Sequence, residues 1–252
     1  MHEIKMLNAG EQGLVVEFGQ SIDKNCNLRV HQFAALISER LAGELIEAVP
    51  TYRSLLLYFD PLTISRADLA GKLRLLLAEL ERLPLQQPPG ARLITIPVCY
   101  DGEFAPDLDF VASHCGLSRQ AVIELHTAAP YQIYMLGFTP GYAYLGGMPE
   151  RLATPRLQQP RTLVPAGSVG IGGSQTAFYT VDSPGGWQLI GRTPVKAFDL
   201  SQAPPFLFKA GDYLQFQAIS RDEYEAIAAA VAAGSYKPPA ANWKGALADD
   251  QD

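Results

Sequence analysis

Three glycine-rich segments decide how the second half of the chain folds: GFTPGYAYLGGMP (137–149), VPAGSVGIGGSQT (164–176) and SPGGWQLIGRTP (183–194). Together with the residues between them, they hold 11 of the 22 glycines and 7 of the 19 prolines. Short apolar runs lie between these turns, and apolar residues alternate along 94–98 and 214–218. This pattern is typical of short strands joined by tight turns. A β-barrel or sandwich is therefore predicted over residues 92–219.

Residues 1–83 alternate between strand-like and helix-like stretches. Strands are expected at 4–7, 14–18, 45–49 and 55–59, with a helical spacing of apolar residues after the second and the fourth. Ser65 and Asp68 indicate the start of the second helix. A small α+β domain is predicted here. The stretch PLQQPPGA at 84–91 cannot continue a helix and is interpreted as the linker between the two domains.

The end of the chain carries one clear helix signal. Ser220 and Glu223 have the spacing of a capping box, and Gly234 is a typical stop, so a C-terminal helix is predicted over 220–234. Two shorter helices are expected within the barrel, over 108–115 and after Ser118. Residues 235–252 contain two prolines and end in DDQD, which predicts a frayed tail.

Composition excludes several classes of function. Only 18% of the 252 residues are charged and the net charge is −6, which offers no positive surface for nucleic acid or anionic lipid. The sequence has no apolar run near the length of a bilayer span. Three cysteines, an odd number, do not form a disulfide framework and fit a reducing compartment. A soluble, cytoplasmic protein is expected.

The glycine-rich segments also contain the candidate site. Polar and aromatic residues lie between the glycines: Tyr142, Tyr144, Gln175, Tyr179 and Trp187. Glycine allows the backbone to approach a ligand closely, so this combination suits a small-molecule pocket or a partner groove. For any single glycine, a tight corner of the barrel is the alternative explanation. Residues 167–173 lack the Lys-Ser/Thr of a phosphate loop and precede a strand, which argues against a Walker or Rossmann site. A nest of backbone N–H groups for an anion stays open.

Among the chemically active side chains, His126 lies on the apolar face of its predicted helix. It is either a core histidine or an acid, base or donor at a pocket. Arg156, Arg161 and Arg192 flank the glycine-rich segments, and each could hold a carboxylate or a phosphate. The histidines and cysteines do not have zinc-ligand spacing, so no metal site is expected.

Several of these motifs together resemble the KipI/allophanate hydrolase subunit 1 family, and within it most closely the branch of 5-oxoprolinase B subunits. The motifs are HCGLS (114–118), ELH (124–126), GFTPGYAYLGG (137–147), TPR (154–156), VPAGSVGIGG (164–173), QT (175–176) and SPGGW (183–187). The sequence departs from the usual family pattern at Tyr142 and Thr180. The resemblance implies an α+β N-terminal domain followed by a cyclophilin-like antiparallel β-barrel with short helices.

The same resemblance implies a component of an ATP-dependent 5-oxoprolinase complex, which hydrolyses 5-oxo-L-proline to L-glutamate. The implied partners are an allophanate hydrolase subunit 2-like protein, which is the C subunit of the oxoprolinase, and a LamB/YcsF-like protein, which is its A subunit. ATP with Mg²⁺ is the implied co-substrate. Two alternatives remain open. One is a KipI-type inhibitor of a sensor histidine kinase, and the other is a carboxyltransferase subunit of a urea carboxylase or allophanate hydrolase-type system.

On this basis, His126, Tyr144, Gln175 and Arg192 are hypothesised to be catalytic residues that face the pocket or its junction with a partner. The glycines are expected to supply backbone N–H donors. The candidate substrate- or nucleotide-binding residues are Phe138, Pro140, Gly141, Arg156, Gly167, Ser168, Gly172, Gly173, Thr176, Tyr179, Gly185, Gly186 and Trp187.

Overall fold

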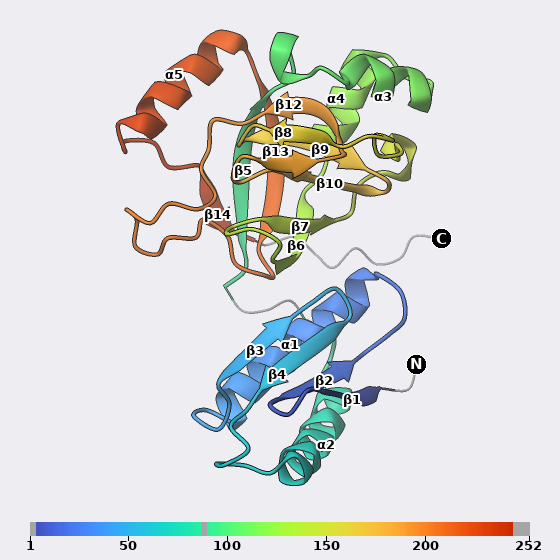
Figure 1. Cartoon of the computed structure of the whole chain (residues 1–252), viewed down its shortest axis with the longest axis vertical. Coiled ribbons are helices and arrows are strands. Elements are labelled where there is room, and N and C mark those ends of the chain that lie inside the picture. The colour runs from blue at the N-terminus through green and yellow to red at the C-terminus, as the bar shows by residue number, and fades with distance from the viewer. Residues whose placement is uncertain (1–3, 87–89, 244–252) are drawn as a thin grey trace. The chain divides into compact units, whose positions relative to one another are not determined.

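The computed structural model describes residues 4–86 and 90–243 (Figure 1). The chain divides into two compact units, Met1–Ala91 and Arg92–Trp243. Residues 87–89 of the predicted linker and residues 244–252 of the predicted tail lie outside the described residues. Among the residues that the structure describes, no helix is both long and apolar enough to cross a membrane.

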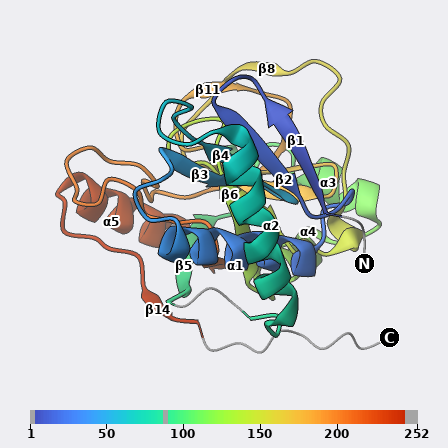
Figure 2. The same cartoon turned by 90° about the horizontal axis from the view of Figure 1, so that it is seen from below.

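The first unit is a four-stranded antiparallel sheet in the order β1-β2-β4-β3, together with two helices (Figures 1 and 2). Leu14 and Val16 on β2 pair with Leu57 and Leu55 on β4, and all four are buried. Helices α1 and α2 contribute to the same apolar core, and α2 begins where Ser65 accepts a hydrogen bond from the Asp68 N–H. The elements are β1 (Lys5–Ala9), β2 (Gly13–Glu17), α1 (Lys24–Arg40), β3 (Glu47–Pro50), β4 (Ser54–Tyr58) and α2 (Arg66–Arg82).

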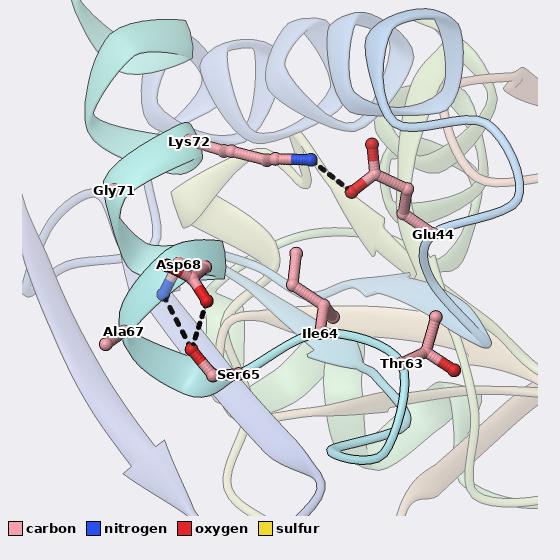
Figure 3. Close-up of a pocket in the computed structure, with 8 residues that line it drawn as sticks. All are labelled: Glu44, Thr63, Ile64, Ser65, Ala67, Asp68, Gly71 and Lys72. Atoms are coloured by element: carbon pink, nitrogen blue, oxygen red, sulfur yellow. Dashed lines mark hydrogen bonds and ion pairs between the residues drawn. The ribbon is translucent and has the colours of Figure 1, made fainter.

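An open hollow of about 560 Å³ lies at the start of α2 (Figure 3). Its charged groups bind each other: the Lys72 ammonium contacts the Glu44 carboxylate at 2.5 Å, and Asp68 accepts from the Ser65 hydroxyl at 2.6 Å. The second of these contacts belongs to the helix cap. The hollow therefore offers little charge to a ligand.

The second unit is built on a mixed sheet in the order β10-β9-β12-β5-β13-β6-β7. Strand β10 also contacts β7, so the sheet nearly closes into a barrel around an apolar core. Ile94, Ile96 and Val98 of β5 are fully buried in it. The strands are β5 (Arg92–Cys99), β6 (Tyr131–Leu136), β7 (Ala143–Gly146), β9 (Ser168–Gly172), β10 (Gln175–Phe178), β12 (Gln188–Arg192) and β13 (Tyr213–Ile219).

The prediction of an entirely antiparallel barrel is wrong at its centre. Strands β5 and β13 run parallel, from the pair Tyr213 and Leu93 to the pair Ile219 and Cys99. Alternation of apolar residues is the same in both kinds of pairing, so the sequence pattern could not distinguish them. Parallel strands need a long crossover, and here it is the remainder of the barrel.

Short helices and a small β-ribbon complete this unit. The ribbon pairs β8 (Arg161–Val164) with β11 (Ser183–Gly185). The helices are η1 (Gly102–Phe104), α3 (Leu108–Cys115), α4 (Arg119–Thr127), η2 (Glu150–Leu152) and α5 (Arg221–Ala232). Helix α4 is capped by Ser118, and α5 starts with the capping box of Ser220 and Glu223.

The predicted tail is partly ordered. Strand β14 (Ala240–Asn242) pairs with residues 92–94 of β5, and Trp243 stacks on Tyr213 with ring centroids 4.5 Å apart. Strand β5 pairs with β12 only at Cys99, which leaves its other end available to β14. An exposed strand edge favours pairing with any segment that reaches it.

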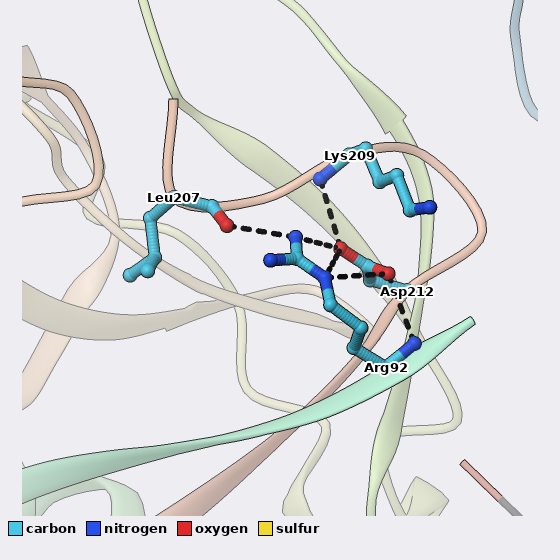
Figure 4. A network of polar contacts seen from close by, with 4 residues as sticks. All are labelled: Arg92, Leu207, Lys209 and Asp212. Carbon is cyan, nitrogen blue, oxygen red and sulfur yellow. Dashed lines mark hydrogen bonds and ion pairs between the residues drawn. The ribbon is translucent and has the colours of Figure 1, made fainter. Parts of the chain in front are cut away.

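A buried carboxylate holds the start of β5 to the turn before β13 (Figure 4). The Asp212 side chain is fully buried and bonds the guanidinium of Arg92 at 2.5 Å. It also accepts from the backbone N–H groups of Arg92, at 3.0 Å, and Lys209, at 3.1 Å. Arg92 in turn donates to the Leu207 carbonyl at 2.9 Å. One carboxylate thus links the first residue of β5 to the turn that leads into β13.

Candidate functional site

The three glycine-rich segments meet at a cavity of about 260 Å³ in the second unit. The first segment contributes the loop between β6 and β7 and Tyr144 of β7, the second contributes Gln175 of β10, and the third contributes β11 and the turn that follows it. The lining residues are Phe138, Tyr142, Tyr144, Arg156, Gln175, Tyr179, Pro184, Gly185, Gly186 and Trp187. Eight of these are candidate catalytic or binding residues from sequence, Tyr142 is one of the aromatic residues that the sequence placed in the candidate site, and Pro184 is the one addition.

Aromatic rings form the wall of this cavity. Tyr142 lies edge-to-face against Tyr144, Tyr179 and Trp187, with centroids 5.0, 6.4 and 6.5 Å away. Tyr142, Tyr179 and Trp187 are buried and belong to a small apolar cluster separate from the barrel core. Edge-to-face contacts between several rings restrict each of them, so the wall is preformed.

Phe138 stands at the edge of the cavity in an unusual conformation. Its φ is 66°, in the left-handed region that disfavours a bulky side chain, and the residue is 69% exposed. Its ring contacts Tyr142 with centroids 5.6 Å apart. An exposed aromatic ring held in a strained backbone conformation is typical of a functional loop.

Two of the candidate glycines act by leaving room for rings. A Cβ on Gly172 would lie 2.6 Å from Nε1 of Trp187, and a Cβ on Gly185 would overlap the hydroxyl of Tyr179. Neither glycine has a positive φ, so it is the close approach of the ring that requires glycine. Both therefore shape the aromatic wall.

Replacing Gly172 with alanine is expected to displace the Trp187 indole and to destabilise the second unit by about 1–3 kcal/mol, because the added methyl overpacks a buried contact. Near-UV circular dichroism and urea unfolding measure the two effects. The control is Gly71→Ala on α2, where an added Cβ meets nothing within 4 Å. A Gly172→Ala protein with the wild-type near-UV spectrum and stability would show that the indole does not lie as described.

The charge at the cavity is positive. Arg156 is the one charged residue among those that line it, and its guanidinium carbon lies 5.7 Å from the centre of the Trp187 ring. Burial raises the pKa of the Tyr179 hydroxyl, opposed by a backbone hydrogen bond with Trp187 and by Arg156 and Arg161. Tyr179 is thus a neutral phenol at physiological pH.

A second arginine near the cavity is neutralised. Arg161 donates to both oxygens of Asp107, at 2.7 and 2.9 Å, and to the Trp187 carbonyl at 3.3 Å. Asp107 also accepts from the Leu189 N–H at 2.6 Å. This network fixes the backbone from the Trp187 carbonyl to the Leu189 N–H. Asp107 could not be predicted from the sequence, because it is 54 residues from Arg161 and carries no motif of its own.

His126 does not face the cavity. It is fully buried, with Nδ1 2.7 Å from the Tyr100 hydroxyl and Nε2 2.8 Å from Oγ1 of Thr176. The Thr176 hydroxyl donates to the Gly170 carbonyl at 3.1 Å, so it accepts from Nε2–H, and Nδ1 accepts from Tyr100. Burial lowers the pKa of His126 to about 3. The structure therefore favours the core histidine of the two interpretations.

Other sequence candidates also lie outside the cavity lining. The Arg192 guanidinium donates through Nε to the Ala166 carbonyl at 3.1 Å and lies over the Phe104 ring. Backbone N–H groups of Gly167 and Gly173 donate to the carbonyls of Tyr179 and Thr154, so these two are not available to an anion. The remaining candidates outside the lining are Pro140, Gly141, Ser168, Gly172 and Thr176.

The described residues contain no group of three or more His, Cys, Asp or Glu side chains placed to hold a metal ion. What the cavity offers a ligand is aromatic surface, the Gln175 amide, the Tyr144 and Tyr179 hydroxyls and one guanidinium. These groups suit a small, flat molecule that carries amide and anionic groups.

A nearly closed mixed barrel with a few short helices is an architecture shared with a solved urea carboxylase. The solved urea carboxylase of Kluyveromyces lactis superposes with a TM-score of 0.75 over 95% of this chain and 24% of that chain, at 22% identity, which shows a shared fold. The family described as "Carboxyltransferase domain, subdomain C and D" matches residues 4–208.

The chain belongs to this carboxyltransferase-domain family, and the family predicted from the motifs is confirmed. Its curated relatives include the 5-oxoprolinase B subunit of Bacillus subtilis (strain 168), which is 42% identical over 86% of this chain and 93% of that protein. The protein of the same name from Escherichia coli O157:H7 is 40% identical over 82% of this chain and 92% of that protein.

Proposed function

We propose that this chain is the B subunit of an ATP-dependent 5-oxoprolinase complex and that its aromatic cavity binds 5-oxo-L-proline. The observation that carries the proposal is the 42% identity, over nearly the whole length of both chains, to a protein named as a 5-oxoprolinase B subunit. The cavity supports it independently, because its size and its aromatic, amide and cationic groups suit a five-membered lactam with a carboxylate.

Hydrolysis of 5-oxo-L-proline requires an activated lactam, because an unstrained amide is a poor electrophile. In the proposed reaction the γ-phosphoryl group of ATP is transferred to the lactam oxygen and ADP leaves. A first water then attacks the ring carbon, and the ring C–N bond breaks as nitrogen takes a proton, which gives γ-glutamyl phosphate. A second water hydrolyses this acyl phosphate to glutamate and phosphate. The chain's own part is to bind and orient the lactam and to keep stray water out.

Within the cavity, Gln175 and Tyr144 are the candidates for contact with the lactam amide. Both are half-buried and line the cavity. The Gln175 side chain offers a donor for the lactam oxygen and an acceptor for the lactam N–H, and the Tyr144 hydroxyl can donate to the same oxygen. Donors placed at that oxygen stabilise the charge that develops there. His126 and Arg192 do not line the cavity and are given no contact with substrate.

ATP and Mg²⁺ are proposed to bind chiefly on the two partner proteins, one like the C subunit of the oxoprolinase and one like its A subunit. Three phosphates require several cations or backbone donors, whereas the residues lining this cavity include one arginine. They include no carboxylate, the ligand that Mg²⁺ prefers. The cavity thus fits the lactam better than the nucleotide.

The test is reconstitution. The full chain, mixed with the allophanate hydrolase subunit 2-like protein and the LamB/YcsF-like protein, is expected to release glutamate from 5-oxo-L-proline only when ATP and Mg²⁺ are present. Omission of this chain should abolish the activity. If the complete mixture, with each protein shown to be folded, releases no glutamate, the proposed function is wrong.

Replacing Gln175 with alanine is expected to lower the turnover of that mixture about tenfold or more, which is the effect of one lost hydrogen bond to the reacting amide, about 1.4 kcal/mol. Initial rates of glutamate release at saturating substrate measure it. Gln159→Ala, at an exposed position, serves as the matched control. Equal rates for Gln175→Ala and the wild type would remove Gln175 from the site.

A further inference from the structure

Arg156 differs from the other arginine beside the cavity in having its charge available. Arg161 is held by both oxygens of Asp107, whereas Arg156 forms no ion pair with any residue that the structure describes. Arg156 is exposed and also lines the cavity. In a chain with a net charge of −6, such a cation beside a preformed cavity indicates a site for an anion.

The position of the guanidinium is restricted by the wall of the cavity. Its carbon lies 5.7 Å from the centre of the Trp187 ring, within the range of a cation–π contact. Trp187 is in turn held by the edge-to-face rings of Tyr142 and Tyr179, and its carbonyl is bound by Arg161. A guanidinium presents a planar fork of N–H groups that can bind both oxygens of a carboxylate at once.

We infer that Arg156 is the specificity-determining residue of this cavity: its guanidinium binds the carboxylate of a ring-shaped ligand whose ring lies against Trp187, Tyr179 and Tyr142. The ligand class is a small cyclic compound with one carboxylate. Phosphate esters are disfavoured, because a dianion would face a single cation here. The inference deepens the proposed function and rests on it for the identity of the natural ligand, 5-oxo-L-proline.

Three probes separate recognition of the carboxylate from recognition of the lactam. The first is 5-oxo-L-proline, which has both groups. The second, 2-pyrrolidinone, has the lactam without the carboxylate, and the third, cyclopentanecarboxylate, has the carboxylate without the lactam. Binding to the full chain can be followed by fluorescence. The chain has two tryptophans, so a Trp243→Phe background leaves Trp187 in the cavity wall as the reporter.

In this background, 5-oxo-L-proline and cyclopentanecarboxylate are expected to bind at least about tenfold more tightly than 2-pyrrolidinone. Arg156→Gln should remove that difference by weakening only the two carboxylates. Arg151→Gln, another exposed arginine without an ion pair among the described residues, should change none of the three affinities. In the reconstituted complex, Arg156→Gln should raise KM for 5-oxo-L-proline about tenfold or more with little change in kcat.

The outcomes distinguish this inference from the proposed function. Arg156-dependent binding of both carboxylates without glutamate release would support the site and contradict the 5-oxoprolinase assignment. Glutamate release with an unchanged KM in Arg156→Gln would support the assignment and overturn the role of Arg156. The role is also overturned if the full chain binds none of the probes and the complex shows no Arg156-dependent KM.

Discussion

Replacing Asp212 with alanine is expected to destabilise the second unit by about 3–5 kcal/mol, because it leaves a cation and backbone donors without their partner. The Asp212 side chain is fully buried and bonds the guanidinium of Arg92 (Figure 4). It also accepts from two backbone N–H groups, those of Arg92 and Lys209. Each buried donor left unsatisfied adds a cost of about 1–3 kcal/mol. Because the Arg92 side chain is 36% exposed, water can solvate part of its charge in the variant. We therefore expect a loss of stability near the lower end of the range of about 3–5 kcal/mol.

Urea unfolding of the full chain measures this loss, and tryptophan fluorescence reports the second unit because Trp187 and Trp243 both lie in it. The matched control is Asp109→Ala. Asp109 pairs with Arg119 at 3.2 Å on the surface and is 76% exposed, so its removal should cost no more than about 1 kcal/mol. If the Asp212 variant is as stable as the Asp109 variant, the buried carboxylate does not tie β5 to the turn before β13.

Local signals explain what the sequence could predict. The capping residues Ser65, Ser118 and Ser220 each begin a helix, because a cap depends only on a hydroxyl and the next few N–H groups. The glycine-rich segments predicted a pocket, and eight of the candidate residues line one. Gly172 and Gly185 show why, since a ring can approach a backbone closely only where no Cβ intervenes.

Contacts between residues far apart in the chain explain which features the sequence could not predict. The parallel pairing of β5 with β13 joins residues about 120 positions apart and has the same apolar alternation as an antiparallel pair. Asp107 meets Arg161 and Leu189, which are 54 and 82 residues away in the sequence. For His126 both interpretations were open. Its partners Tyr100 and Thr176, 26 and 50 residues away, favour the buried, neutral form.

That neutral histidine makes stability depend on pH. Burial lowers the pKa of His126 in the folded protein to about 3, whereas an unfolded histidine titrates near 6.5. Between these values the unfolded chain binds a proton that the folded protein does not. The free energy of unfolding therefore falls as the pH falls from about 6.5 toward 3, by about 1.4 kcal/mol per pH unit from this residue. Above about pH 6.5 His126 contributes no pH dependence.

His126→Gln is expected to remove this slope, so the stability difference between the wild type and the variant should shrink by about 2 kcal/mol between about pH 6.5 and 4.5. Carboxylates that titrate in the same range are common to both proteins and cancel in the difference. His114→Gln, at an exposed position, is the matched control. A direct NMR titration of the His126 ring in the wild type provides a second readout that needs no folded variant. In the described arrangement the buried His126 ring bonds Thr176, the residue next to Gln175 of the cavity. Protonation of this ring near pH 6 in the folded protein would contradict that arrangement.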